Sequence, residues 1–148
     1  MAFDLRQLQP LIGLWKGEGE IAPNPWGGAG KCRGRWSFRY DAAVRNLVHD
    51  YEESRADGSG FNGHGVFCPE PEGDDLLWFW FDSYGFPPMD PARGLFRRDL
   101  LVLTRRTPRG VGRSTFRLDG DRFEYLVEAQ TPGQPGFAEV MHGVFSRV

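Results

Sequence analysis

From Trp15 onward, the side chains of this sequence alternate between two faces with a period of two residues. This is the period of a β-strand that buries one face and exposes the other. In the clearest segment, the face expected to be buried carries Cys32, Gly34, Trp36, Phe38 and Tyr40. The 20 glycines and 11 prolines among the 148 residues also disfavour long helices. The sequence therefore predicts an all-β chain with many turns.

Only the start of the chain has a helical pattern. Apolar residues recur at three-to-four spacing between Phe3 and Ile12, with Asp4 placed to cap a short helix and Gly13 to end it. About ten short strands follow, without the helix-length segments that parallel crossovers need. Closure of such a meander removes its unpaired edges. We expect residues 1–148 to form a single domain, an antiparallel up-and-down β-barrel of about ten strands with a short N-terminal helix.

Two turns allow strand registers to be predicted. A two-residue turn at Asp57-Gly58 places Tyr51 opposite His64. One face then gathers Leu47, His49, Tyr51, His64, Val66 and Cys68. A turn at Asp119-Gly120 instead gathers Phe116, Leu118, Phe123, Tyr125 and Val127. An error of one residue in either register would move a whole set of side chains to the other face.

Two motifs resemble known proteins. Residues 13–20 (GLWKGEGE) resemble the opening motif of the calycins, the superfamily of lipocalins and fatty-acid-binding proteins, and most closely of its bacterial members and the nitrobindins. Residues 78–88 (WFWFDSYGFPP) resemble the central signature of a bacterial family of lipocalin-like proteins of unassigned function. The resemblance covers nearly the whole chain. It implies a ten-stranded barrel with a ligand cavity, and it implies no reaction.

A barrel of this size has room for one small ligand. We therefore predict a binding protein for a small apolar or amphipathic molecule, with the loop 84–91 as a lid. The candidate ligand-binding residues are Trp15, Trp36, Phe38, Tyr51, His64, Trp78, Trp80, Asp82, Tyr84, Phe86 and Tyr125.

The polar candidates leave alternatives open. Asp82 is suited either to orient a ligand or to fix the loop by accepting a hydrogen bond from its backbone. Arg93 and Arg97 are candidates to attract an anionic head group. His64 is expected to pair with Tyr51 at the barrel lining or rim, and the alternative is a zinc or copper site made by His49, His64 and Cys68.

Two further functions compete with small-molecule binding. Nitrobindins ligate haem iron through a histidine near the end of the chain, so the resemblance makes His142 a candidate haem ligand, although the alternation of Met141, Gly143 and Phe145 points His142 outward. The segment 76–81 is apolar on both faces and needs cover from the N-terminal helix or a second subunit. This predicts, as a third reading, a homodimeric or structural interaction module with a packed interior.

Composition excludes several other classes. The 18 Lys and Arg against 20 Asp and Glu give a net charge of −2, which does not suit a nucleic-acid binder. No apolar run reaches the length of a membrane span. The two cysteines and the absence of a signal-like start predict a reduced, cytoplasmic protein. The sequence contains no recognisable catalytic motif and no other cofactor motif, so it favours a binding protein over an enzyme.

Overall fold

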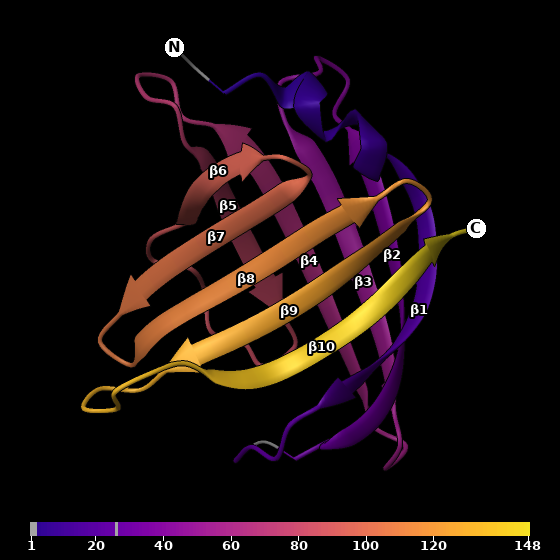
Figure 1. The fold of residues 1–148 in the computed structure, drawn as a ribbon, viewed down its shortest axis with the longest axis vertical. Coiled ribbons are helices and arrows are strands. Elements are labelled where there is room, and N and C mark those ends of the chain that lie inside the picture. Colours follow the sequence, from indigo (N-terminus) through magenta and orange to yellow (C-terminus); the bar gives the residue numbers. More distant parts are fainter. Residues whose placement is uncertain (1–2, 26) are drawn as a thin grey trace.

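The computed structural model describes residues 3–25 and 27–148. Within these residues, one 3-10 helix precedes ten antiparallel strands, and the strands close into a barrel because β1 pairs with both β2 and β10 (Figure 1). The elements are η1 (Leu5–Leu11), β1 (Gly13–Ile21), β2 (Gly30–Tyr40), β3 (Leu47–Arg55), β4 (Gly60–Pro69), β5 (Leu76–Asp82), β6 (Ala92–Arg97), β7 (Leu100–Thr107), β8 (Gly110–Asp119), β9 (Arg122–Gln130) and β10 (Ala138–Arg147). The predicted up-and-down barrel with a short N-terminal helix is confirmed. None of the described helical residues forms a helix long and apolar enough to cross a membrane.

The helix η1 closes one end of the barrel (Figure 1). The carboxylate of Asp4 caps it by accepting a hydrogen bond from the backbone N–H of Arg6 at 3.0 Å, as the sequence predicts. Pro10 lies inside this short helix, which is a 3-10 helix rather than an α-helix. Its three leucines, Leu5, Leu8 and Leu11, are buried and face the barrel interior.

Arg147 fastens this closed end. Its guanidinium donates hydrogen bonds to the carbonyl oxygens of Pro10 at 2.6 Å and Ile12 at 2.7 Å. The same group lies 4.3 Å from the ring centroid of Trp15, whose indole N–H donates to the carbonyl of Leu11 at 2.8 Å. The last strand, the first strand and the helix are thereby tied together.

Packed aromatic rings fill the half of the barrel next to η1. The ring of Trp36 lies at the centre, in contact with rings from its own strand, from β3 and from β8 to β10. Its partners include Phe38, Tyr51, Phe116, Phe123, Tyr125 and Phe145. Trp15, Trp36 and Phe38 are at most 2% exposed, so the described side chains of this half form a packed core.

The β3–β4 hairpin differs by one residue from its predicted register. Tyr51 pairs with Gly63 rather than with His64. The turn has three residues instead of two, because the N–H of Gly58 bonds to the carbonyl of Arg55 at 3.0 Å and Gly58 takes the left-handed conformation with φ of 85°.

This shift moves half of the predicted face outward. His64 pairs across the strands with Asp50, its ring nitrogen lies 2.7 Å from that carboxylate, and its side chain is 46% exposed. Cys68 also turns outward, whereas His49 stays inside and fully buried. The grouping of His49 with His64 and Cys68 is therefore wrong, and so is the Tyr51–His64 pair.

The β8–β9 hairpin shows the opposite outcome. Leu118 pairs with Phe123 and Phe116 with Tyr125, a shift of two residues from the prediction. Because a shift of two preserves the faces, Phe116, Leu118, Phe123 and Tyr125 all point inward as predicted.

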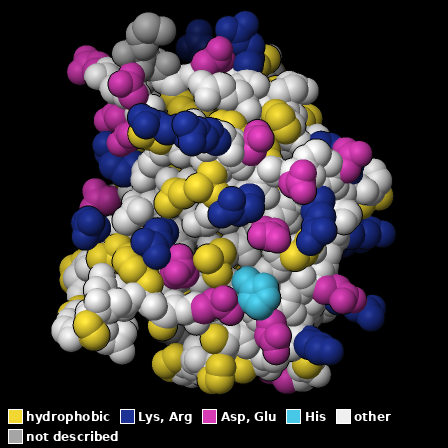
Figure 2. Space-filling model, in the orientation of Figure 1, with side chains coloured by type: hydrophobic (Ala, Val, Ile, Leu, Met, Phe, Trp, Pro, Cys, Tyr) yellow, Lys and Arg dark blue, Asp and Glu magenta, His cyan; other side chains and the backbone are white. Residues whose placement is uncertain are grey.

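The outer surface is mixed in character. Figure 2 shows acidic and basic side chains interspersed over the face formed by β7 to β10. On β5, Phe81 points outward and stays 48% exposed, because η1 lies at the barrel end rather than over this strand.

Candidate functional site

The barrel end away from η1 contains a cavity of about 410 Å³. Its wall comes from the strand ends farthest from the helix, including Ile21 of β1, Asp82 of β5 and Gly112 of β8. The segment that follows β1 contributes Pro23, and β10 contributes Val140. The volume falls within the range typical of small-molecule sites.

The wall of this cavity is mainly aromatic and aliphatic. Trp78, Trp80 and Tyr125 face it, and Leu103, Val127 and Met141 complete the apolar lining. The indole N–H of Trp78 donates to Nε2 of the buried His49 at 2.9 Å, and this hydrogen bond holds the indole ring in its orientation. The cavity therefore presents flat apolar surfaces held in place by buried hydrogen bonds.

Asp82 holds the lining to the loop that follows β5. One carboxylate oxygen accepts from the indole N–H of Trp80 at 2.9 Å, and the other accepts from the backbone N–H of Tyr84 at 2.9 Å. Of its two predicted roles, Asp82 thus has the geometry for fixing the loop. Tyr84 consequently lies at the cavity rim.

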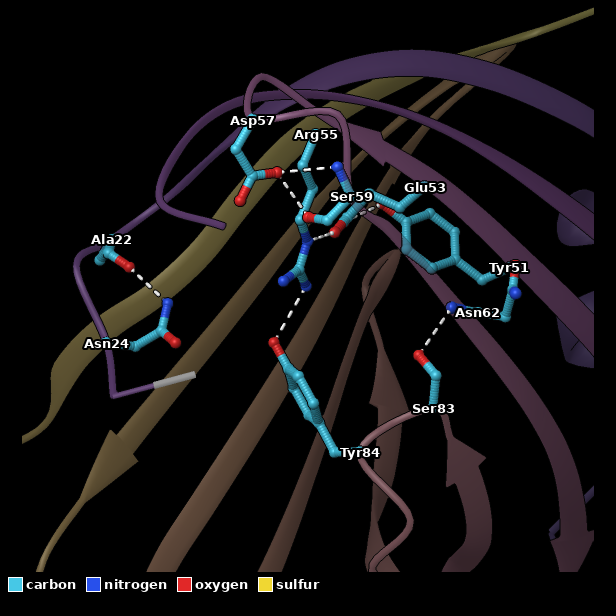
Figure 3. A network of polar contacts seen from close by, with 10 residues as sticks. All are labelled: Ala22, Asn24, Tyr51, Glu53, Arg55, Asp57, Ser59, Asn62, Ser83 and Tyr84. Atoms are coloured by element: carbon cyan, nitrogen blue, oxygen red, sulfur yellow. Dashed lines mark hydrogen bonds and ion pairs between the residues drawn. The ribbon is translucent and has the colours of Figure 1, made fainter. Parts of the chain in front are cut away.

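Glu53 and Arg55 form a buried ion pair on the inward face of β3 (Figure 3). Glu53 accepts a hydrogen bond from the hydroxyl of Tyr51 at 2.6 Å and one from Nε of Arg55 at 2.7 Å. Arg55 also donates to the hydroxyl of Tyr84 at 3.0 Å and lies 5.0 Å from the ring centroid of Phe61. This network connects the cavity wall to the rim loop.

Burial keeps four titratable groups of this interior uncharged, in contrast to the Glu53–Arg55 ion pair. It raises the pKa of Tyr51 and of Tyr125 above the ordinary value, and the Glu53 carboxylate adds to the effect at both. Burial, with a further contribution from Glu53, raises the pKa of the Cys32 thiol to about 12. It lowers the pKa of His49 to about 3, and His64 contributes in the same direction. At neutral pH these phenols, the thiol and the imidazole are all neutral.

The predicted ligand residues divide into three groups. Six line the cavity: Tyr51, Trp78, Trp80, Asp82, Tyr84 and Tyr125. Trp15, Trp36 and Phe38 lie in the packed half. Phe86 and His64 lie outside the cavity, Phe86 with its ring centroid 4.5 Å from the Arg109 guanidinium.

Sequence reasoning missed several polar lining residues, chiefly Glu53, Arg55, Arg105 and Ser114. Strand alternation could have identified three of them. Glu53 and Arg55 point to the same face of β3 as Tyr51, and Arg105 points to the same face of β7 as Leu103. Arg93, predicted to attract an anion, points outward and forms an ion pair with Glu70 at 3.1 Å.

The residues present do not fit a haem ligated by His142. This histidine lies on the outer face of β10, opposite Glu20 of β1, with half of its side chain exposed and a ring nitrogen 2.9 Å from Glu139. The barrel wall therefore separates it from the cavity. Among the described residues, no cluster of three or more His, Cys, Asp or Glu side chains could hold a metal ion.

No protein-family model matches this chain, and no curated protein matches it. Among solved structures, the chain resembles the crystal structure of Rv2717c from M. tuberculosis, with a TM-score of 0.75 and 19% identity over 97% of this chain and 96% of that one. It also resembles the structure of EF1p2_mFAP2b bound to DFHBI, with a TM-score of 0.54 and 12% identity over 97% of this chain and 98% of that one. Both likenesses show that the chain has the barrel fold of these structures.

Proposed function

We propose that this protein binds one small apolar or amphipathic molecule in the open half of its barrel, in the manner of the lipocalin-like proteins that its motifs resemble. The observation that carries the proposal is the contrast between the two halves. One half is packed with aromatic rings, whereas the other holds a cavity of about 410 Å³ lined by Trp78, Trp80 and Tyr125.

The distribution of polar groups supports an amphipathic ligand. Apolar side chains line the depth of the cavity, and the charged Arg55, Asp82 and Arg105 lie at strand ends near the rim. A bound molecule would place its apolar body against the indoles, where burial of apolar surface gives about 25 cal/mol per Å² before the costs of association. The similar barrel of EF1p2_mFAP2b was solved with DFHBI bound, which agrees with this use of the fold.

The test is a calorimetric titration with 2-naphthamide, a neutral flat probe, on the full chain. We expect one site per chain. Val127→Phe adds volume on the inward face of β9 and should weaken binding at least about tenfold. The matched control, Leu126→Phe, makes a similar change on the outward face of the same strand and should leave binding within twofold. A wild-type chain that does not bind, or equal effects of the two variants, would contradict the proposal.

Native mass spectrometry of freshly purified protein complements this titration. A stoichiometric adduct would identify the class of the natural ligand.

The same spectrum measures the mass of the particle and so tests the homodimer. We keep the homodimer as a second proposal because Phe81 is exposed on the outer face of β5, next to the partly buried Phe79 and Val66 of the same surface.

A further inference from the structure

Among the described residues, the cavity lining includes one cation, Arg105, that forms no ion pair. Glu53 and Arg55 neutralise each other at 2.7 Å, and Arg113 forms an ion pair with Glu128 at 3.0 Å. Arg105 lines the cavity from β7, on the same face as the buried Leu103. Within residues 3–25 and 27–148, its guanidinium makes no hydrogen bond or ion pair.

The hydrogen bonds of the wall also leave hydroxyl donors available. The indole N–H groups of Trp78 and Trp80 are both used, and each oxygen of Asp82 already accepts one hydrogen bond. The Ser114 hydroxyl lies close to that of Tyr125, and each of these hydroxyls has one proton that it can donate.

Strand register places these donors beside one open space. Arg105 pairs directly with Gly112 across β7 and β8, and Ser114 lies two residues farther along the same inward face. Such diagonal neighbours are about 7–8 Å apart, within reach of a long side chain. A Cβ added at Gly112 would meet no atom within 4 Å, so the missing side chain leaves room between the two donors.

We propose that the ligand is an anion with a flat apolar body, and that Arg105, Gly112 and Ser114 form the niche that binds its compact charged group, such as a carboxylate. This inference rests on the proposed function, because it assigns the ligand class for the same cavity. A guanidinium suits a planar carboxylate, and the apolar wall beside it strengthens the attraction by keeping water away. The aromatic rings deeper in the cavity bind the rest of the molecule.

The experiment compares 2-naphthoate with 2-naphthamide, which have the same ring system and differ in charge. We expect wild-type protein to bind 2-naphthoate about tenfold more tightly than 2-naphthamide in calorimetry at low salt. Arg105→Gln should remove this preference while it leaves 2-naphthamide binding within twofold. Arg106→Gln removes the same charge from the exposed neighbouring residue and should preserve the preference.

A second variant tests the niche without changing any charge. Gly112→Val fills the open space beside an intact Arg105 and should weaken 2-naphthoate more than 2-naphthamide, with circular dichroism to verify the fold. Equal wild-type affinities for the two compounds, or an unchanged preference in Arg105→Gln, would overturn the anion niche and leave the proposed function standing. Failure of both compounds to bind would overturn the proposed function itself.

Discussion

Loss of the negative charge of Glu53 should be among the most damaging single changes in this protein. The side chains of Glu53 and Arg55 are only 3% and 7% exposed, and their ion pair measures 2.7 Å. Glu53→Gln keeps the shape and one acceptor oxygen but leaves the guanidinium buried without its counter-ion. Breaking a buried pair in this way costs about 3–5 kcal/mol, so we expect Glu53→Gln to lower the free energy of unfolding by about that amount.

Urea unfolding followed by far-UV circular dichroism measures this loss. The control is Glu18→Gln, whose partner Arg33 lies 3.7 Å away with both side chains about four-fifths exposed, and it should cause no measurable loss. The double variant Glu53→Gln/Arg55→Met removes both buried charges and should be more stable than Glu53→Gln alone. A cost below about 1 kcal/mol for Glu53→Gln, or a double variant as unstable as the sum of the singles, would refute the reasoning.

Two further predictions concern the closed half of the barrel. Folding lowers the pKa of His49 from 6.5 to about 3, so His49 binds a proton in the unfolded chain at a higher pH than in the folded one. The free energy of unfolding should therefore decrease as the pH falls from 6.5 toward 3, by up to about 1.4 kcal/mol per pH unit. Urea unfolding at pH 7 and pH 4.5 should show a smaller decrease for His49→Gln than for wild type. Arg147→Ala removes the bonds to Pro10 and Ile12 and should lower Tm by roughly 5–10 °C in calorimetry, with 2-naphthamide binding unchanged.

Strand parity predicted the barrel interior well wherever long aromatic faces defined it. On β2, Cys32, Trp36 and Phe38 are buried, as the alternation of that segment predicts. On β10, the inward positions of Met141 and Phe145 follow from the same alternation, which correctly points His142 outward. The burial of a whole hydrophobic face determines which side chains point inward. An error in the predicted end of a strand does not change that assignment.

The length of the β3–β4 turn could not be predicted from the local sequence pattern. Gly58 is compatible with both a two-residue and a three-residue turn, and the difference reverses the faces of His64 and Cys68. The division of the barrel into a packed and an open half could not be predicted from the sequence either. Trp36 and Trp80 both face the interior, and they differ in their depth along the barrel axis. Depth depends on how many strands close the barrel and how they tilt.

Among the described residues, η1 and Arg147 close one barrel end, so the ligand that we propose would enter and leave at the other end. Entry and release must then pass the rim formed by Arg55, Tyr84 and Arg105. The residence time of that ligand would consequently depend on the rim, whereas the deeper contacts would hold its apolar body. Substitutions at the rim would then change how fast the proposed ligand exchanges, while the deep wall would keep the same preference for its shape.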